Sequence, residues 1–296
     1  MAAALPFAET LDLSRLPAFE VVQPVYETIR AERLASLAAR LAAQGLPTDT
    51  LDLESDPLVI LEEEDAYREL LNLQGVNDAA RGVSLAFATG GALDHIAATY
   101  YAHIGIRRLD GEDDARFRRR IALAPEAASP FTPGAYVYAA LTAGLAVADA
   151  VALNYASGLV EPGEVLIVTL AQPGGDADQV ADLVRAALDA RPIKALTDTV
   201  IVQPATAVVA PVSAVIEVPP GPDRNLVKSD AAARLAAYAA GRRRIGLRLT
   251  RSGISAALHL AAADNVRLAT PAGDVDPGPA GVVELGAVDL AVELPQ

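Results

Sequence analysis

The sequence of 296 residues contains no cysteine and no tryptophan, and aromatic residues make up only 4% of it. The absence of cysteine excludes disulfide bonds and thiolate metal sites. Without tryptophan the chain also lacks the largest aromatic platform for binding a sugar. Because hydrophobic residues still make up 52% of the chain, we expect folded domains whose cores are filled by alanine, leucine and valine.

Positive charge is also scarce, since the formal net charge is −14. Residues 1–65 carry thirteen acidic residues against four arginines, a net charge of −9. A nucleic-acid-binding surface is therefore not expected, and cationic partner surfaces fit this charge better. No apolar run approaches the roughly 20 residues that span a bilayer, and the N-terminus does not resemble a signal peptide. We expect a soluble chain, without membrane association, in a reducing cytoplasm.

The order of the patterns predicts an α+β protein: an N-terminal all-helical region with a long helix, followed by two small α+β domains. We expect four segments, namely an extended N-terminal arm at 1–24, a helical region at 25–124, and α+β domains at 134–205 and 210–296. The first α+β domain reads helix–strand–strand–helix–strand, and the second reads strand–helix–helix–strand–strand.

The longest helical pattern covers residues 57–89. Ser55-Asp56-Pro57 is a typical helix start, with a capping side chain followed by proline in the first turn. Apolar and small residues then recur at steps of four and three, which predicts a helix-packing seam. The seam consists of Ala66, Leu70, Leu73, Asn77, Ala80, Ser84 and Phe87. Gly75 interrupts the same stretch and should cost about 1 kcal/mol relative to alanine.

Two interpretations of the seam remain open. It can bind a helix of another chain, with Asn77 setting the register of the bundle. Alternatively, the helix packs within its own domain, and Asn77 binds nearby backbone. The pattern alone supports both interpretations equally.

Two arginine clusters are candidates for a charged interface with an acidic partner, because a guanidinium group binds a carboxylate with two hydrogen bonds. The first follows the acidic loop 110–114, and the second lies between two expected helices. The candidates are Arg118, Arg119, Arg120, Arg242, Arg243 and Arg244. Local pairing inside the chain is the alternative interpretation.

Catalytic and metal-binding patterns are weak. The chain has no Walker loop and no HExxH, GxSxG or GxGxxG motif. The acidic run Glu62–Asp65 fans around a helix instead of converging, and His95 and His103 lack a third ligand at metal-binding spacing. We expect Asp176 to cap a helix, residues 274–278 to form a surface turn, and His259 to lie in a core. No catalytic residue, cofactor or metal site is therefore predicted.

A resemblance to a known family covers most of the chain in the correct order. It begins with DPLVILEEEDAYRELLNLQGVNDAARGVSLAFATGGALDHIA, Gly105–Arg108 and DDARFRRRI. It continues through Gly134-Ala135-Tyr136, PGEVLIVTL, LTDTVIVQPA, VPPGPD and GRRRIGLRLTRSGISAALH. This ordered set resembles the baseplate J family of contractile-tailed phages, whose members are structural and not enzymes.

The resemblance implies a wedge subunit of the virion tail baseplate, assembled in the host cytoplasm. The implied partners are a second copy of the chain, a smaller I-type tail protein and a lysozyme-like wedge protein, with hub and sheath contacted indirectly. The helix at 57–89 would lie in a core bundle, and the α+β domains would form the dimer contacts of the ring. Transmitting the trigger for sheath contraction requires pliable connections, for which 125–133 and 204–211 are the candidates.

Two other functions are considered. The same resemblance fits a subunit of a tailocin or of a secretion-type injection machine. A carboxylate-dependent cell-wall hydrolase is the enzymatic alternative, and its only support is the abundance of aspartate and glutamate.

Overall fold

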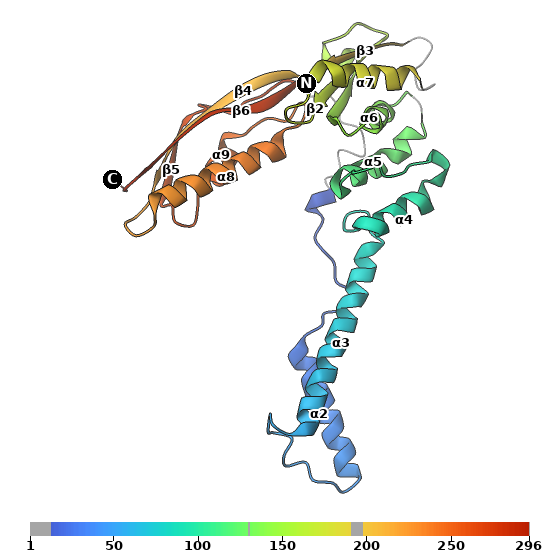
Figure 1. Cartoon of the computed structure of the whole chain (residues 1–296), viewed down its shortest axis with the longest axis vertical. Coiled ribbons are helices and arrows are strands. Elements are labelled where there is room, and N and C mark those ends of the chain that lie inside the picture. Colours follow the sequence, from blue (N-terminus) through green and yellow to red (C-terminus); the bar gives the residue numbers. More distant parts are fainter. Residues whose placement is uncertain (1–12, 130, 191–197, 296) are drawn as a thin grey trace. The chain divides into compact units, whose positions relative to one another are not determined.

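The computed structural model describes residues 13–129, 131–190 and 198–295 (Figure 1). These residues form two compact units. We call residues 13–108 with 113–118 the helical unit, and residues 109–112 with 119–295 the α+β unit. The first part of the predicted arm, 1–12, lies outside the described residues. Within the described chain, no helix is both long and apolar enough to cross a membrane.

The helical unit begins with the short turn η1 (Leu13–Arg15) and an extended segment. It continues through α2 (Tyr26–Ala43), α3 (Pro57–Gly82), α4 (Gly90–Tyr100), η2 (Ala102–Ile104) and the first turn of α5 (Asp114–Ala127). Asp56 caps α3 by accepting a hydrogen bond from the amide of Leu58 at 2.8 Å. The predicted start of the long helix is therefore confirmed.

The long helix ends earlier than predicted. α3 stops at Gly82, and residues 83–89 form turns in which the amides of Phe87 and Ala88 both donate to the carbonyl of Ser84. The prediction of one helix through residue 89 is therefore wrong in its last two turns. Two predicted seam positions, Ser84 and Phe87, lie in this turn region and not on the helix.

The α+β unit contains a first sheet with strand order β1-β2-β3. Its elements are α6 (Pro133–Thr142), β1 (Val147–Leu153), η3 (Tyr155–Ser157), β2 (Glu164–Ala171), α7 (Ala177–Asp189) and β3 (Thr199–Pro204). β1 is antiparallel to β2, and β3 is parallel to β2. Residues 134–141 of α6 are all buried, in keeping with a segment that has almost no polar side chain.

The second sheet has the order β5-β4-β6, with β5 antiparallel and β6 parallel to the central strand. Its elements are β4 (Thr206–Glu217), α8 (Arg224–Arg242), α9 (Arg251–Leu258), β5 (Asn265–Thr270) and β6 (Gly281–Glu293). The two helices lie along one face of this sheet (Figure 1). Both predicted element orders, and with them the α+β fold class, are confirmed.

One expected flexible connection is part of this sheet. Residues 206–210 pair with residues 281–285 of β6, so the predicted pliable segment 204–211 lies almost entirely in strands. Hydrophobic contacts also continue from one sheet to the other. Ile245 and Val282, from the part of the chain that forms the second sheet, belong to the same core cluster as β1 and β2. The interpretation of 204–211 as a pliable link is therefore wrong.

Candidate partner interface

The helices α2 and α3 form an antiparallel hairpin with a small core. Buried apolar residues on the two helices are Ile29, Val59 and Ala66. The rest of the apolar stripe of α2, Leu34, Leu37 and Leu41, is only half-buried. On α3, six large hydrophobic side chains are exposed: Leu58, Ile60, Leu61, Tyr67, Leu71 and Val76. Two helices alone bury too little apolar area to form a closed core.

Ion pairs fix the register of this hairpin. Arg30 binds Glu63 at 2.7 Å. Arg33 contacts three carboxylates at 2.9–3.0 Å, those of Glu62, Asp65 and Glu69. The hydrogen bond that Arg33 donates to Glu69, followed by the charge of Glu62, raises the pKa of Arg33. Surface ion pairs contribute under about 1 kcal/mol each. They therefore determine how α2 is aligned along α3 more than they stabilise the hairpin.

The acidic run of α3 therefore has a structural use in this chain. Three of its four members, Glu62, Glu63 and Asp65, bind arginines of α2, and Glu64 binds Arg68 one turn later. Within the described residues, no three histidine or carboxylate side chains are grouped to hold a metal ion.

The extended arm packs against the second half of α3 through Asn77. The side chain of Asn77 accepts from the amides of Val21 and Val22 at 2.8 and 3.1 Å, and donates to the carbonyl of Val22 at 2.9 Å. Asn77 is 4% exposed. Phe19 contacts Phe87 edge to face, with ring centroids 5.9 Å apart. The arm thus covers the Asn77 side of the second half of α3.

The seam positions lie partly under their own chain. Ala66 and Asn77 are buried, and the other five, Leu70, Leu73, Ala80, Ser84 and Phe87, are half-buried. Asn77 binds backbone of the arm, as the second interpretation of the seam expects. The chain does not fully cover the five half-buried positions, so the assignment of the seam to a partner helix stays a prediction.

Replacement of Asn77 by alanine is expected to release the arm. It removes three hydrogen bonds worth about 1 kcal/mol each, and water replaces part of that loss because the arm is mostly exposed. Amide exchange at Val21 and Val22 should accelerate on the order of tenfold, as measured by hydrogen–deuterium exchange of the full chain. Asn72→Ala, an exposed position on the same helix, is the control. Unchanged exchange at both valines would contradict this role of Asn77.

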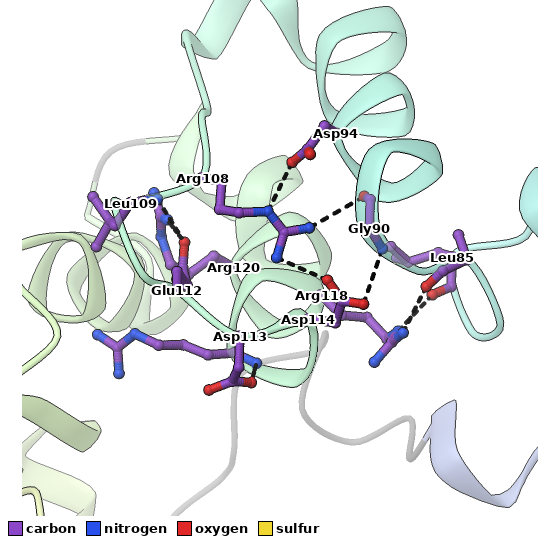
Figure 2. Close-up of polar contacts among 12 residues, drawn as sticks. Leu85, Gly90, Asp94, Arg108, Leu109, Glu112, Asp113, Asp114, Arg118 and Arg120 are labelled. Atoms are coloured by element: carbon purple, nitrogen blue, oxygen red, sulfur yellow. Dashed lines mark hydrogen bonds and ion pairs between the residues drawn. The ribbon is translucent and has the colours of Figure 1, made fainter.

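Arg118 of α5 and Arg108, which lies before α5, hold the turn after α3 and the start of α4 (Figure 2). Arg118 donates to the carbonyls of Leu85 and Ala88 at 2.9 and 2.7 Å. Arg108 binds Asp94 at 2.9 Å and Asp114 at 2.8 Å, and its guanidinium lies 4.7 Å from the centre of the Phe117 ring. Burial lowers the pKa of Arg108, but the hydrogen bonds with the two carboxylates outweigh it and raise that pKa overall.

The stability of this turn is expected to depend on pH through Asp114. The amide of Gly90 donates to this carboxylate at 2.9 Å and, together with Arg108, lowers the pKa of Asp114 below its ordinary value of 3.8. The stabilisation is complete above the unfolded pKa, and it is lost as the pH falls through the lowered folded pKa. Urea titrations of the wild type and Asp114→Asn should differ at pH 7, and the difference should shrink as the pH falls below the ordinary aspartate pKa of 3.8. Asp56, whose pKa is also lowered, is unchanged in both proteins and cancels in the comparison. A difference independent of pH would contradict this.

The other two arginines of the first cluster bind inside the α+β unit. Arg120 pairs with Glu112 at 2.6 Å, and the two side chains are 2% and 0% exposed (Figure 2). The same carboxylate accepts from the amide of Leu109 at 2.9 Å. Arg119 binds Asp149 at 2.6 Å. Asp149 was not anticipated, although one acidic residue inside the apolar strand VADAVAL is a signal for a buried, paired charge.

The second arginine cluster also makes contacts within the chain. Arg242 donates to the carbonyl of Arg248, and Arg243 binds both Glu284 and the carbonyl of Ala171 at 2.9 Å. Arg244 lies 3.6 Å from Asp149, with its side chain 45% exposed. The predicted use of the two clusters as a charged partner interface stays a prediction.

The remaining candidates for chemistry have structural positions. Asp176 caps α7 by accepting from two backbone amides, as predicted. In the segment 274–278, predicted to be a surface turn, Asp276 accepts from the amide of Gly278 and Val275 forms a β-bridge with Leu249. His95 and His103 are exposed. His259 is exposed at the C-terminal end of α9, so its predicted core position is wrong. The apolar residues beside it, Leu258 and Leu260, fill the core instead.

Comparison with known proteins agrees with a structural role. A family model described as the baseplate J-like N-terminal domain matches residues 54–109, which contain α3, α4 and the turn between them. Baseplate protein J of Escherichia phage P2 is 35% identical over 280 residues, covering 90% of this chain and 92% of the relative. The chain therefore belongs to the baseplate J family.

Proposed function

We propose that this chain is a wedge subunit of a contractile-tail baseplate, where it forms part of the ring around the hub and transmits the trigger for sheath contraction. The observation that carries the proposal is the α2–α3 hairpin, which buries few apolar residues and exposes six large ones on α3. A helix pair of this kind gains stability when further helices complete its core.

The proposed partners follow from family membership and the acidic hairpin. They are a second copy of the chain, a smaller I-type tail protein and a lysozyme-like wedge protein, with the hub and sheath contacted indirectly. In this proposal the helical unit enters a bundle, and the α+β unit forms the contacts of the ring. The hairpin lacks a closed core, which suits a place in a helix bundle. The α+β unit has its own core and buried ion pairs, which suits a folded unit at the ring contacts.

The mass of the assembled complex tests this function. The full chain is co-expressed with the proteins encoded beside it, purified through a tag and measured by size-exclusion chromatography with light scattering. We expect a discrete complex with two copies of the 30.6 kDa chain and other tail proteins. Recovery of the chain as a monomer, with the other proteins folded and present, would sink the proposal. Capsid genes in the same cluster would distinguish a phage from a tailocin or secretion machine.

The variant Leu70→Asp with Leu73→Asp is expected to abolish association and leave the α+β unit folded. Two carboxylates at half-buried seam positions cannot be desolvated without a partner charge. Circular dichroism of the free chain separates the two interpretations of the seam. Unchanged helicity with lost association supports a partner interface, whereas lost helicity shows that the seam acts within the chain. Asn72→Asp with Ala79→Asp, at exposed positions on α3, is the charge-matched control.

A further inference from the structure

A second stripe runs along α3, separate from the predicted seam. Ile60, Tyr67 and Leu71 are 53%, 51% and 46% exposed. Together with three polar residues they form a series in which positions alternate by four and three. The series is Ile60, Glu64, Tyr67, Leu71, Gln74 and Asp78. The spacing places all six on one face of α3, and the three exposed apolar members can pack against another helix.

This stripe lies on a different side of the helix from the seam. At 3.6 residues per turn, its centre is about 120° around α3 from Ala66 and Asn77. Those two residues are buried, so α2 and the arm cover their side, whereas the stripe stays open. A shallow groove of ≈ 520 Å³ borders it, lined by Tyr26, Ile60, Glu63, Glu64, Tyr67 and Leu70. A helix with interfaces on two sides is the geometry of a member of a bundle.

Gly75 is a second, independent observation on the same side. It lies in the middle of α3, where glycine costs about 1 kcal/mol relative to alanine. A Cβ atom at this position would meet nothing within 4 Å, so packing inside this chain does not explain the glycine. Gly75 lies one turn after Leu71 and beside Asp78. A missing side chain there lets the backbone of a second helix approach closely.

The charges around the stripe indicate what kind of helix fits it. Glu64 and Asp78 lie on the stripe with side chains 56% and 76% exposed. Glu64 pairs with Arg68, and Asp78 lies 3.7 Å from Arg81. In total α3 carries six carboxylates against two arginines. A second copy of α3 laid along the stripe would add carboxylates to an acidic surface, whereas a helix with lysine or arginine beside its apolar stripe would complement it.

We propose that the stripe Ile60–Tyr67–Leu71, with Gly75 one turn after its last residue, binds an amphipathic helix of a different baseplate protein that carries basic residues beside its apolar stripe. This inference rests on the proposed function and adds to it the face used and the chemistry of the partner. The buried positions Ala66 and Asn77 then face α2 and the arm, and the stripe binds the other chain.

The absence of cysteine allows a direct test with single cysteines. Leu71→Cys and Val76→Cys are made in the full chain. Both positions are 46% exposed, but Val76 points to the opposite side of α3 from the stripe. Maleimide labelling is compared between the free chain and baseplates isolated from cells that make all tail proteins. In the baseplate we expect Leu71→Cys to react at least about tenfold more slowly than in the free chain, because modification requires access to the thiol.

The deciding readout is the chain that a short thiol–amine crosslinker joins to Leu71→Cys. A crosslink to a lysine in a helix of another baseplate protein is the expected result. A crosslink to a second copy of this chain would contradict the proposed partner. Labelling of Leu71→Cys that is equally fast in the baseplate would show that the stripe is not the interface. Tyr67→Cys repeats the test if Leu71→Cys does not assemble. A wild-type chain absent from the baseplate would instead refute the proposed function.

Charge reversal tests the chemistry of the partner separately. Glu64→Arg with Asp78→Arg should weaken association on the order of 100-fold, since like charges then face each other. The matched control, Glu32→Arg with Glu54→Arg, makes the same change in net charge at exposed positions of the same unit. If both variants lose association equally, the effect depends on net charge alone. That result would contradict a basic partner helix on the stripe.

Discussion

Replacement of Arg120 by methionine is expected to lower the free energy of unfolding of the α+β unit by about 3–5 kcal/mol. The substitution keeps most of the side-chain volume but leaves Glu112, whose side chain is fully buried, without its cation. Arg120 also donates to the hydroxyl of Thr142 at 3.3 Å and lies 5.8 Å from the centre of the Tyr138 ring. The effect is large mainly because the buried carboxylate of Glu112 loses its counter-charge, and less because the attraction between the two charges is lost.

The measurement is thermal unfolding followed by near-ultraviolet circular dichroism of the buried tyrosines on α6, Tyr136 and Tyr138. For a unit of this size, the transition should fall by about 10 °C. The double variant Glu112→Leu with Arg120→Met should recover much of the loss, because an apolar pair needs no compensation for desolvation. Arg40→Met, at an exposed position, is the control. A single variant as stable as the wild type would show that the pair is not desolvated in solution.

Local signals in the sequence predicted the fold well. The cap at Asp56 and the cap at Asp176 rest on side chains that bond amides two or three residues away, and both predictions are confirmed. The order of strands and helices follows from periodicity within each segment, and it is confirmed for both sheets. These features need no information from distant parts of the chain.

The errors came from contacts between distant residues. α3 was predicted to continue to 89, but Arg118 binds the carbonyls of Leu85 and Ala88 from about 30 residues away. Residues 206–210 were predicted to be a pliable link, but their strand partner begins only at Gly281. Periodicity cannot supply either contact, because it reports the face of an element and not what covers it.

The candidate interface shows the same limit. The 4-3 pattern correctly marked a side of α3 that packs against something, as the burial of Ala66 and Asn77 shows. It did not reveal that α2 and the arm of the same chain lie there. The second stripe became visible only after the covered side was known, since Ile60, Tyr67 and Leu71 are distinguished by their exposure and not by their spacing alone.

Substitution of Asp149 is expected to weaken the connection between the two sheets of the α+β unit. Its side chain is 5% exposed and binds Arg119 of α5 at 2.6 Å. It also accepts from the amide of Ile245 at 2.9 Å, in the loop between α8 and α9. One carboxylate on a strand of the first sheet therefore connects α5 with the part of the chain that forms the second sheet.

Asp149→Ala is expected to destabilise the α+β unit by about 3–5 kcal/mol, because it leaves a largely buried guanidinium and a buried amide without their acceptor. Asp149→Asn keeps an acceptor but loses the charge, so its effect should be smaller, on the order of half. Asp178→Ala, an exposed position in the first turn of α7, is the control. Urea unfolding measures the loss, and hydrogen exchange of the Ile245 amide locates it.

This substitution also tests whether the two sheets act as one body in the baseplate. If Asp149 joins them, Asp149→Ala should speed amide hydrogen exchange in both β2 and β4, since the shared core around Ile245 and Val282 opens with it. Faster exchange in one sheet alone would mean that the sheets open independently. Joint opening would place any flexible step of the proposed sheath triggering outside the α+β unit, because a unit held by a buried carboxylate and a shared core moves without bending.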